Sequence, residues 1–151
     1  MSKEGDSAFR PRSILPRETD WPTIVIESGW SETLTKLRED AHRWLENSRG
    51  DVKIVLLFSI GRRARTMIIE KWENRPVPTN RPRTRSNTTQ IPTQIQAITI
   101  DSNSDRVNGA PLILEFRKIF LRQAVPPLEH DFTFTTQHLL AYATNFWARL
   151  Q

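Results

Sequence analysis

Trp21-Pro22-Thr23-Ile24-Val25-Ile26-Glu27-Ser28-Gly29 is the stretch of sequence from which the fold can be worked out. Residues 23–26 are all β-branched, which favours a strand. Apolar side chains fall on both of its faces, so we expect a strand over Trp21–Glu27 that is covered on both sides. Gly29 is expected to end it. Glu27 then lies at the end of a buried strand, where a carboxylate is unusual.

A helix is predicted directly after this strand, over Glu32–Arg49. Ser31 can cap its first turn, and Gly50 provides a stop at its end. The apolar side chains between them recur at helical spacing and form a single stripe, which should pack on the sheet. This stripe consists of Leu34, Leu37, Ala41, Trp44 and Leu45.

Two more buried strands are predicted next, Lys53–Ile60 and Thr66–Trp72, joined by a hairpin turn at residues 61–63. In the second strand, Met67, Ile69 and Lys71 should face one side of the sheet, and Ile68, Glu70 and Trp72 the other. The stretch 74–94 then contains many Thr, Asn and Arg residues and repeated prolines. Its composition predicts a long mobile loop.

The remaining elements are shorter. A strand is predicted over Ile95–Ile100, and residues 131–135 should be extended. The stretch Leu112–Phe120 is apolar enough for a strand or a short helix, and its period does not separate the two. Thr135 or Thr136 caps a final helix that runs to about residue 150. We therefore predict one α/β domain over residues 1–151, with a mixed sheet of about four or five strands, a long helix packed on it and a C-terminal helix.

Composition limits the class of protein. A chain of 151 residues fits one domain. It has no cysteine, which excludes disulfides and thiolate metal sites. The longest apolar run, Ile54–Ile60, is about a third of the roughly 20 residues that a membrane span needs. The first residues lack the apolar segment of a signal peptide. An intracellular protein, cytoplasmic or nuclear, with no membrane partner is expected.

The charge is unevenly distributed. Lysine and arginine number 22 against 17 acidic residues, a formal charge of +5. Arginine clusters of this kind attract polyanions, so DNA or RNA is a candidate partner. The alternative is that these arginines are only solvated loop residues. The candidate nucleic-acid-binding residues are Arg62, Arg63 and Arg65 in one cluster and Arg81, Arg83 and Arg85 in the other.

Most enzyme motifs are absent: the sequence has no Gly-rich phosphate loop, no nucleophile elbow and no His-x-x-x-His pair. What remains is a pair of acidic residues in distinctive surroundings. Asp6 ends the segment Lys3-Glu4-Gly5-Asp6, and Glu27 lies in Pro22-Thr23-Ile24-Val25-Ile26-Glu27-Ser28-Gly29-Trp30-Ser31-Glu32. The helix that follows contains Leu37-Arg38-Glu39-Asp40-Ala41-His42-Arg43-Trp44-Leu45.

On these segments, the chain from Lys3 to Trp72 resembles a group of fungal proteins of the restriction-endonuclease-like, PD-(D/E)XK type. The later Gly109-Ala110-Pro111-Leu112 and the closing helix are also similar to that group. The resemblance implies that Asp6 and Glu27 are catalytic carboxylates that bind Mg²⁺ through oxygen. The metal would generate a hydroxide and stabilise charge on the phosphate. A cation, usually a lysine two residues after the glutamate, would complete the site.

That lysine position is Gly29 here, so another cation is needed. Helical geometry ranks the candidates on the following helix. Arg38 lies roughly 70° from the centre of the apolar stripe and Lys36 roughly 130°. Arg38 is thus the third candidate catalytic residue, and Glu27 is expected to face the start of the helix beside it. The alternative role for Glu27 is a structural salt bridge with Arg38.

Two functions from different classes follow as expectations. The first is a Mg²⁺-dependent nuclease, incomplete in this chain because the motif lysine is missing and because the helix and strand that usually precede the first acidic residue are missing. The second is a non-catalytic interaction or dimerisation module that keeps the nuclease-like fold. Sheet edges or apolar faces left uncovered tend to be covered by a partner, so a homo-oligomer is predicted.

Overall fold

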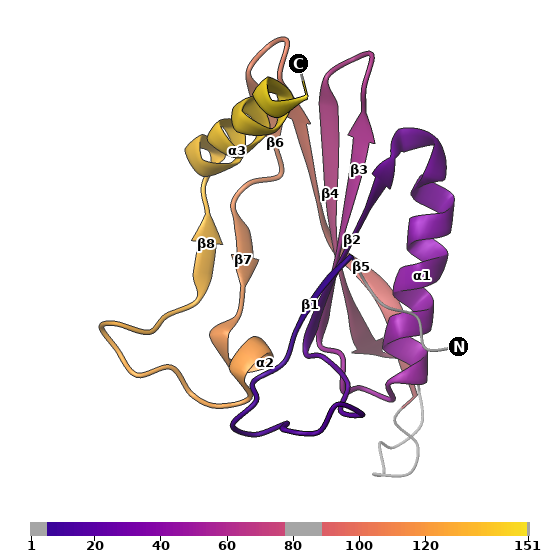
Figure 1. The fold of residues 1–151 in the computed structure, drawn as a ribbon, viewed down its shortest axis with the longest axis vertical. Coiled ribbons are helices and arrows are strands. Elements are labelled where there is room, and N and C mark those ends of the chain that lie inside the picture. Colours follow the sequence, from indigo (N-terminus) through magenta and orange to yellow (C-terminus); the bar gives the residue numbers. More distant parts are fainter. Residues whose placement is uncertain (1–5, 78–88, 151) are drawn as a thin grey trace.

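A computed structural model gives the structure of residues 6–77 and 89–150 (Figure 1). Its main sheet is mixed: β2 and β3 are parallel, and every other neighbouring pair is antiparallel. The mixed α/β class is therefore confirmed, with more strands than the four or five expected. The six strands lie side by side in chain order as β1 (Ser7–Phe9), β2 (Ile24–Trp30), β3 (Ile54–Gly61), β4 (Thr66–Pro76), β5 (Gln90–Asp101) and β6 (Arg106–Asn108).

The parallel pair of strands is joined by helix α1 (Leu34–Asn47), as a parallel connection requires. Strand β2 continues through Gly29 to Trp30, so Gly29 does not end it. A short 3-10 turn, η1 (Ser31–Thr33), comes before α1. The expected cap at Ser31 is wrong, because the N-cap of α1 is Thr33 and its side chain makes no capping hydrogen bond.

Helix α1 lies along one face of the sheet (Figure 1), and the side chains of that face pack against it. The predicted stripe on the helix is largely confirmed, since four of its five apolar members are buried and Leu34 is partly exposed. The sheet contributes the alternate residues of its strands that point to this side. The buried set is Val25, Leu37, Ala41, Trp44, Leu45, Val52, Val55, Leu57 and Trp72.

The opposite face is covered by the C-terminal third of the chain (Figure 1). The stretch Leu112–Phe120, left open between strand and helix, contains both: β7 (Leu112–Leu114) and then α2 (Phe116–Phe120). Strand β7 pairs with β8 (Phe132–Phe134), which leads into α3 (Thr136–Arg149). The buried set here is Ile24, Ile54, Leu56, Met67, Ile69, Ile98, Ile100, Leu112, Leu114, Ile119, Leu139, Ala143 and Trp147.

Helix α3 begins with a capping box at Thr135, one of the two residues proposed as its cap. The Thr135 hydroxyl accepts a hydrogen bond from the His138 backbone N–H, and His138 Nδ1 accepts one from the Thr135 N–H at 3.1 Å. Two backbone donors at the start of the helix are thereby satisfied. In the described part of the chain, no helix has the length and apolar character needed to cross a membrane.

The predicted loop 74–94 is shorter than expected at both ends. Strand β4 runs to Pro76 and β5 starts at Gln90, with Asn74 opposite Pro92. This stretch, although rich in prolines and polar residues, therefore contains the ends of two long strands. The second arginine cluster, Arg81, Arg83 and Arg85, lies outside the described residues.

Candidate functional site

Glu27 lies on the α1 face of the sheet. It sits two residues after Val25, which packs against α1, and its own side chain is only 5% exposed. The indole Nε1 of Trp44 on α1 donates a hydrogen bond of 3.0 Å to Glu27 Oε1. The expectation that Glu27 is desolvated and faces the helix is confirmed. Its partner Trp44, however, lies in the third turn of the helix rather than at its start.

Arg38 is positioned as its helical angle predicts, at the edge of the buried face, while Lys36 is exposed. The hydrogen bonds of the Arg38 guanidinium go to Glu70 on β4. Arg38 Nε lies 3.1 Å from Glu70 Oε1, and Arg38 Nη2 lies 2.6 Å from Glu70 Oε2. These hydrogen bonds, together with the charge of Glu70, raise the pKa of Arg38. The residue proposed as a catalytic cation is therefore engaged by a buried carboxylate.

Glu70 was not among the predicted site residues, although the alternation in β4 correctly placed it on the face of Trp72. The Trp72 indole Nε1 also donates to Glu70 Oε1, at 3.0 Å. The strand register places Glu27 opposite Leu57 and Leu57 opposite Glu70. Two buried carboxylates thus flank Leu57 beneath α1, and each accepts a hydrogen bond from a tryptophan.

Asp6 lies just before β1 and contacts the neighbouring strand. Asp6 Oδ2 accepts hydrogen bonds from the Ser28 backbone N–H at 2.7 Å and from the Ser28 hydroxyl at 2.9 Å. Ser28 follows Glu27, so its side chain points to the opposite face of the sheet. The structure thus brings Asp6 to β2 one residue from Glu27, but the two carboxylates turn to different faces.

The Mg²⁺ site that the resemblance implies would require the two carboxylates to meet. A magnesium ion needs its oxygen ligands at about 2.1 Å in near-octahedral geometry. Glu27 is directed under α1 and Asp6 toward Ser28, so their carboxylates do not converge on a common point. Among the described residues there is also no group of three or more His, Asp or Glu side chains able to hold a metal. The residues as placed do not fit the ion.

Gly29 occupies the position of the missing motif lysine, and its surroundings are tightly packed. A Cβ atom at this position would lie 2.5 Å from Thr33 Oγ1, inside the range that real Cβ contacts avoid. Thr33 is itself held there, because its hydroxyl donates to the Trp30 carbonyl at 2.7 Å. The start of the helical segment therefore occupies the space that a side chain at position 29 would need.

The first arginine cluster lies at the turn between β3 and β4. Arg62, Arg63 and Arg65 are exposed, and the Arg62 guanidinium lies 5.3 Å from the centre of the Trp30 ring. The Trp30 side chain, at the end of β2, is 39% exposed. One end of the sheet thus combines an exposed indole with three cationic side chains, which we call the arginine–tryptophan end.

The arginine–tryptophan end is held by the neighbouring turn between β5 and β6. The Ser102 N–H donates to the Arg65 carbonyl at 3.0 Å, and the Asn103 amide donates to the Ala64 carbonyl at 2.9 Å. Asn103 is held in turn, since its backbone N–H donates to Asp101 Oδ1. The backbone that carries the three arginines is therefore fixed, while their side chains reach into solvent.

Sequence reasoning also missed a buried ionic cluster on the face of the sheet that points away from α1. Lys71 Nζ, 4% exposed, donates to both carboxylate oxygens of Glu115 and to the Ile113 carbonyl. Lys118 Nζ donates to both oxygens of Glu73. Burial opposes ionisation of Glu115, but the Lys71 hydrogen bond and the charges of Lys71 and Lys118 hold its pKa below the ordinary value. The only sequence signal was a lysine inside a buried strand.

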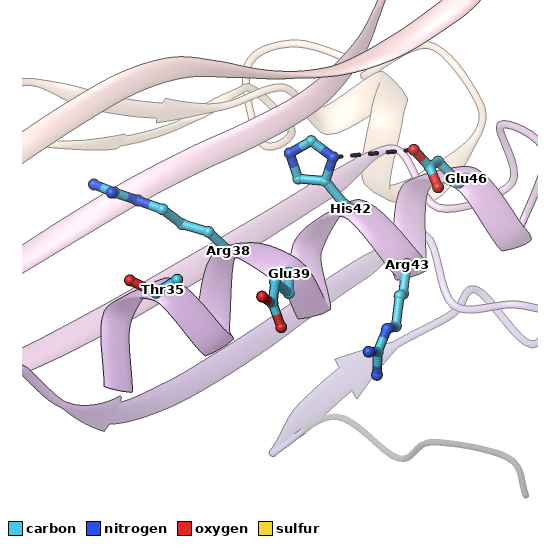
Figure 2. A pocket seen from close by; sticks show the side chains of 6 residues that line it. All are labelled: Thr35, Arg38, Glu39, His42, Arg43 and Glu46. Atoms are coloured by element: carbon cyan, nitrogen blue, oxygen red, sulfur yellow. Dashed lines mark ion pairs between the residues drawn. The ribbon is translucent and has the colours of Figure 1, made fainter. Parts of the chain in front are cut away.

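Two hollows on the described surface adjoin residues of the predicted site. The first is shallow and follows one side of α1, where Figure 2 shows Arg38, His42 and Glu46 in a row, with His42 Nδ1 4.0 Å from Glu46 Oε1. All of its lining residues come from this helix. The second is a cleft of about 790 Å³ between the sheet and α3, with Asp6 and Ser28 among its lining residues.

No family model, no curated protein and no solved structure was found to match this chain.

Proposed function

We propose that this chain is a non-catalytic module that keeps a restriction-endonuclease-like fold and binds nucleic acid at the arginine–tryptophan end. The observation that carries the proposal is the arrangement of Asp6 and Glu27. One carboxylate is hydrogen-bonded to Ser28 on one face of the sheet, and the other accepts a hydrogen bond from Trp44 beneath α1. Carboxylates that do not converge cannot share the metal ion on which this type of cleavage depends.

The missing cation supports the same conclusion. Position 29 has no lysine and no space for one while Thr33 is in place. Arg38, the proposed substitute, forms a two-hydrogen-bond pair with Glu70, and an arginine stays charged and so is a poor proton shuttle. Glu27 and Arg38 therefore act as structural contacts between α1 and the sheet, and Asp6 as a contact between the segment before β1 and β2.

Nucleic acid is the proposed partner because of the chemistry of the arginine–tryptophan end. Exposed aromatic rings stack on unpaired bases, and neighbouring cations contact the phosphates. Trp30 supplies such a ring, and Arg62, Arg63 and Arg65 supply the charges. This combination favours single-stranded DNA or RNA, bound with little preference for sequence.

A Mg²⁺-dependent nuclease is the second candidate, and one observation favours it. Ser7 pairs with Ile26, and Asp6 hydrogen-bonds to Ser28, so Asp6 lies beside the strand that carries Glu27. A rearrangement of α1 and the segment around Asp6 that turned both carboxylates to one side would be required.

The experiment measures binding and cleavage on the same fluorescent single-stranded DNA and RNA oligonucleotides. We expect binding that falls steeply as salt is raised, because phosphate contacts release counterions, and no cleavage with Mg²⁺ or Mn²⁺. Arg62→Ala should reduce the salt slope by about one unit, and Trp30→Ala should weaken binding by about 1–3 kcal/mol. Arg17→Ala, which removes an exposed arginine from the β1–β2 connection, is the matched control.

Two results would contradict the proposal. Binding that is absent at low salt, or that does not change with salt, would remove nucleic acid as the partner. Metal-dependent cleavage that disappears in both Asp6→Asn and Glu27→Gln, while both variants remain folded by circular dichroism, would establish the nuclease instead.

A further inference from the structure

The cleft of about 790 Å³ lies on the opposite face of the sheet from α1. Strands β2, β3 and β4 form one wall with apolar side chains such as Leu56 and Phe58, and β7, β8 and α3 form the other. Phe58 on β3 and Tyr142 on α3 meet in an edge-to-face contact, with ring centres 6.1 Å apart. A volume of this size falls within the roughly 300–1,000 Å³ of sites for small organic ligands.

The apolar character of this cleft is pronounced, and much of it is aromatic. Its lining includes Phe58, Phe134, Tyr142 and Phe146, contributed by β3, β8 and α3. Phe134 and Tyr142 are 37% and 47% exposed, so their rings are accessible from solvent. An occupant must therefore have a substantial apolar body, and aromatic faces in such a site also attract cations.

Asp6 gives the cleft its charge. Among the described residues it is the only lysine, arginine or carboxylate side chain in the lining, and its Oδ2 already accepts two hydrogen bonds from Ser28. Within the described residues, Asp6 Oδ1 accepts none and can receive a donor from a ligand. His138 is also in the lining, and its Nδ1 already accepts the capping hydrogen bond from the Thr135 N–H.

We propose that this cleft binds an amphipathic organic cation, in which an apolar body lies between the sheet and α3 and a protonated amine pairs with Asp6. The negative charge excludes an anionic head group, and the aromatic lining favours a cationic one over a neutral one. This site is separate from the arginine–tryptophan end, so the proposal does not depend on nucleic-acid binding.

The test titrates the protein at neutral pH with three probes that share one apolar chain, octylamine, octanol and octanoate, using isothermal titration calorimetry. We expect octylamine to bind most tightly and octanoate most weakly. Asp6→Asn should weaken octylamine binding by about tenfold, the scale of one charge-assisted hydrogen bond, and leave octanol binding unchanged. Asp51→Asn removes an exposed carboxylate outside the cleft and should change neither.

A second pair of variants tests the location without altering charge. Ala141 lies on α3 in the lining of the cleft and is exposed, so Ala141→Trp should fill the cleft and abolish binding of all three probes without unfolding the helix. Ala148→Trp places the same side chain at an exposed position of α3 outside the lining and should bind as the parent does.

The proposal fails if octanoate binds as tightly as octylamine, if Asp6→Asn has no effect on octylamine, or if no probe binds at all. It also fails if light scattering shows that Ala141→Trp converts a dimer into a monomer, because the cleft would then be occupied by a second copy of the chain.

Discussion

Arg38 on α1 and Glu70 on β4 form a two-hydrogen-bond ion pair in which the carboxylate is 2% exposed and the arginine side chain 45% exposed. The pair joins the crossover helix to a strand beyond the parallel pair that the helix connects. The pair fixes the rotation of α1 about its own axis, because the Arg38 guanidinium must extend from the edge of the apolar stripe to the buried Glu70 carboxylate.

Replacing Arg38 by methionine should lower the free energy of unfolding by about 1–3 kcal/mol, since within residues 6–77 and 89–150 Glu70 would keep only its hydrogen bond from Trp72. Urea unfolding measures the change. Lys36→Met, on the exposed side of the same helix, should stay within about 0.5 kcal/mol of the parent. An Arg38→Met protein as stable as the parent would show that the pair contributes nothing.

Glu27→Gln should also lower stability by about 1–3 kcal/mol, the scale for disturbing a buried polar contact. A double-mutant cycle with Trp44→Phe separates this contact from the change in volume, and we expect a coupling of at least about 0.5 kcal/mol. A coupling of zero would mean that the two side chains act independently, and the structural role given to Glu27 would be wrong.

Lys71→Met should lower stability by about 3 kcal/mol, because it leaves the Glu115 and Glu73 carboxylates short of a buried cation. It should also raise the pKa of Glu115, since burial then acts with less opposition. Carboxyl NMR follows this titration. Arg75→Met is the matched control, as Arg75 also pairs with Glu73 but its side chain is 52% exposed. An unchanged Glu115 titration would contradict the assignment.

Glu129 should titrate unusually low. Hydrogen bonds from the Arg122 guanidinium and from the Val125 N–H lower its pKa to about 2, from an ordinary value of 4.5. A carboxylate whose pKa is lower in the folded state stabilises that state above pH 4.5, and the contribution is lost as pH falls toward 2. In Arg122→Gln the NMR titration of Glu129 should return toward 4.5. A Glu129 that titrates at its ordinary value in the parent would show that the pair does not form in solution.

The predicted homo-oligomer can be tested by light scattering at high micromolar concentration, where we expect a species larger than the monomer. The prediction comes from sheet edges and apolar faces left uncovered. The structure adds exposed apolar side chains between α2 and β8, where Val125 is 64% and Leu128 92% exposed. Val125→Asp combined with Leu128→Ser should then give a monomer. A parent protein that is already a clean monomer would rule the prediction out.

Local patterns in the sequence were sufficient to predict the central layers. The β-branched run before Glu27 and the apolar stripe on α1 each predict one element and the face that it buries. The alternation in β4 predicts that Glu70 and Lys71 point to different faces of the sheet. Partners distant in sequence were not predictable in the same way. Arg38 could be ranked by its angle on the helix, but choosing Glu70 rather than Glu27 requires the register of three strands.

The same limit explains the other misses. Lys71 meets Glu115 across 44 residues, and nothing near either residue indicates the pairing. The ends of β4 and β5 were read as loop because Pro76 and Pro92 usually interrupt strands. Here Pro76 is the last residue of β4, and Pro92 lies near the start of β5.

The position of Thr33 beside Gly29 also limits which substitutions position 29 can accept. A lysine introduced at position 29 in the present background would push against Thr33 Oγ1, so Gly29→Lys alone should be destabilising. Once Thr33 is replaced by alanine, the same substitution has room. The effect of the residue at one position thus depends on what already occupies the other, and replacing Thr33 first avoids the clash.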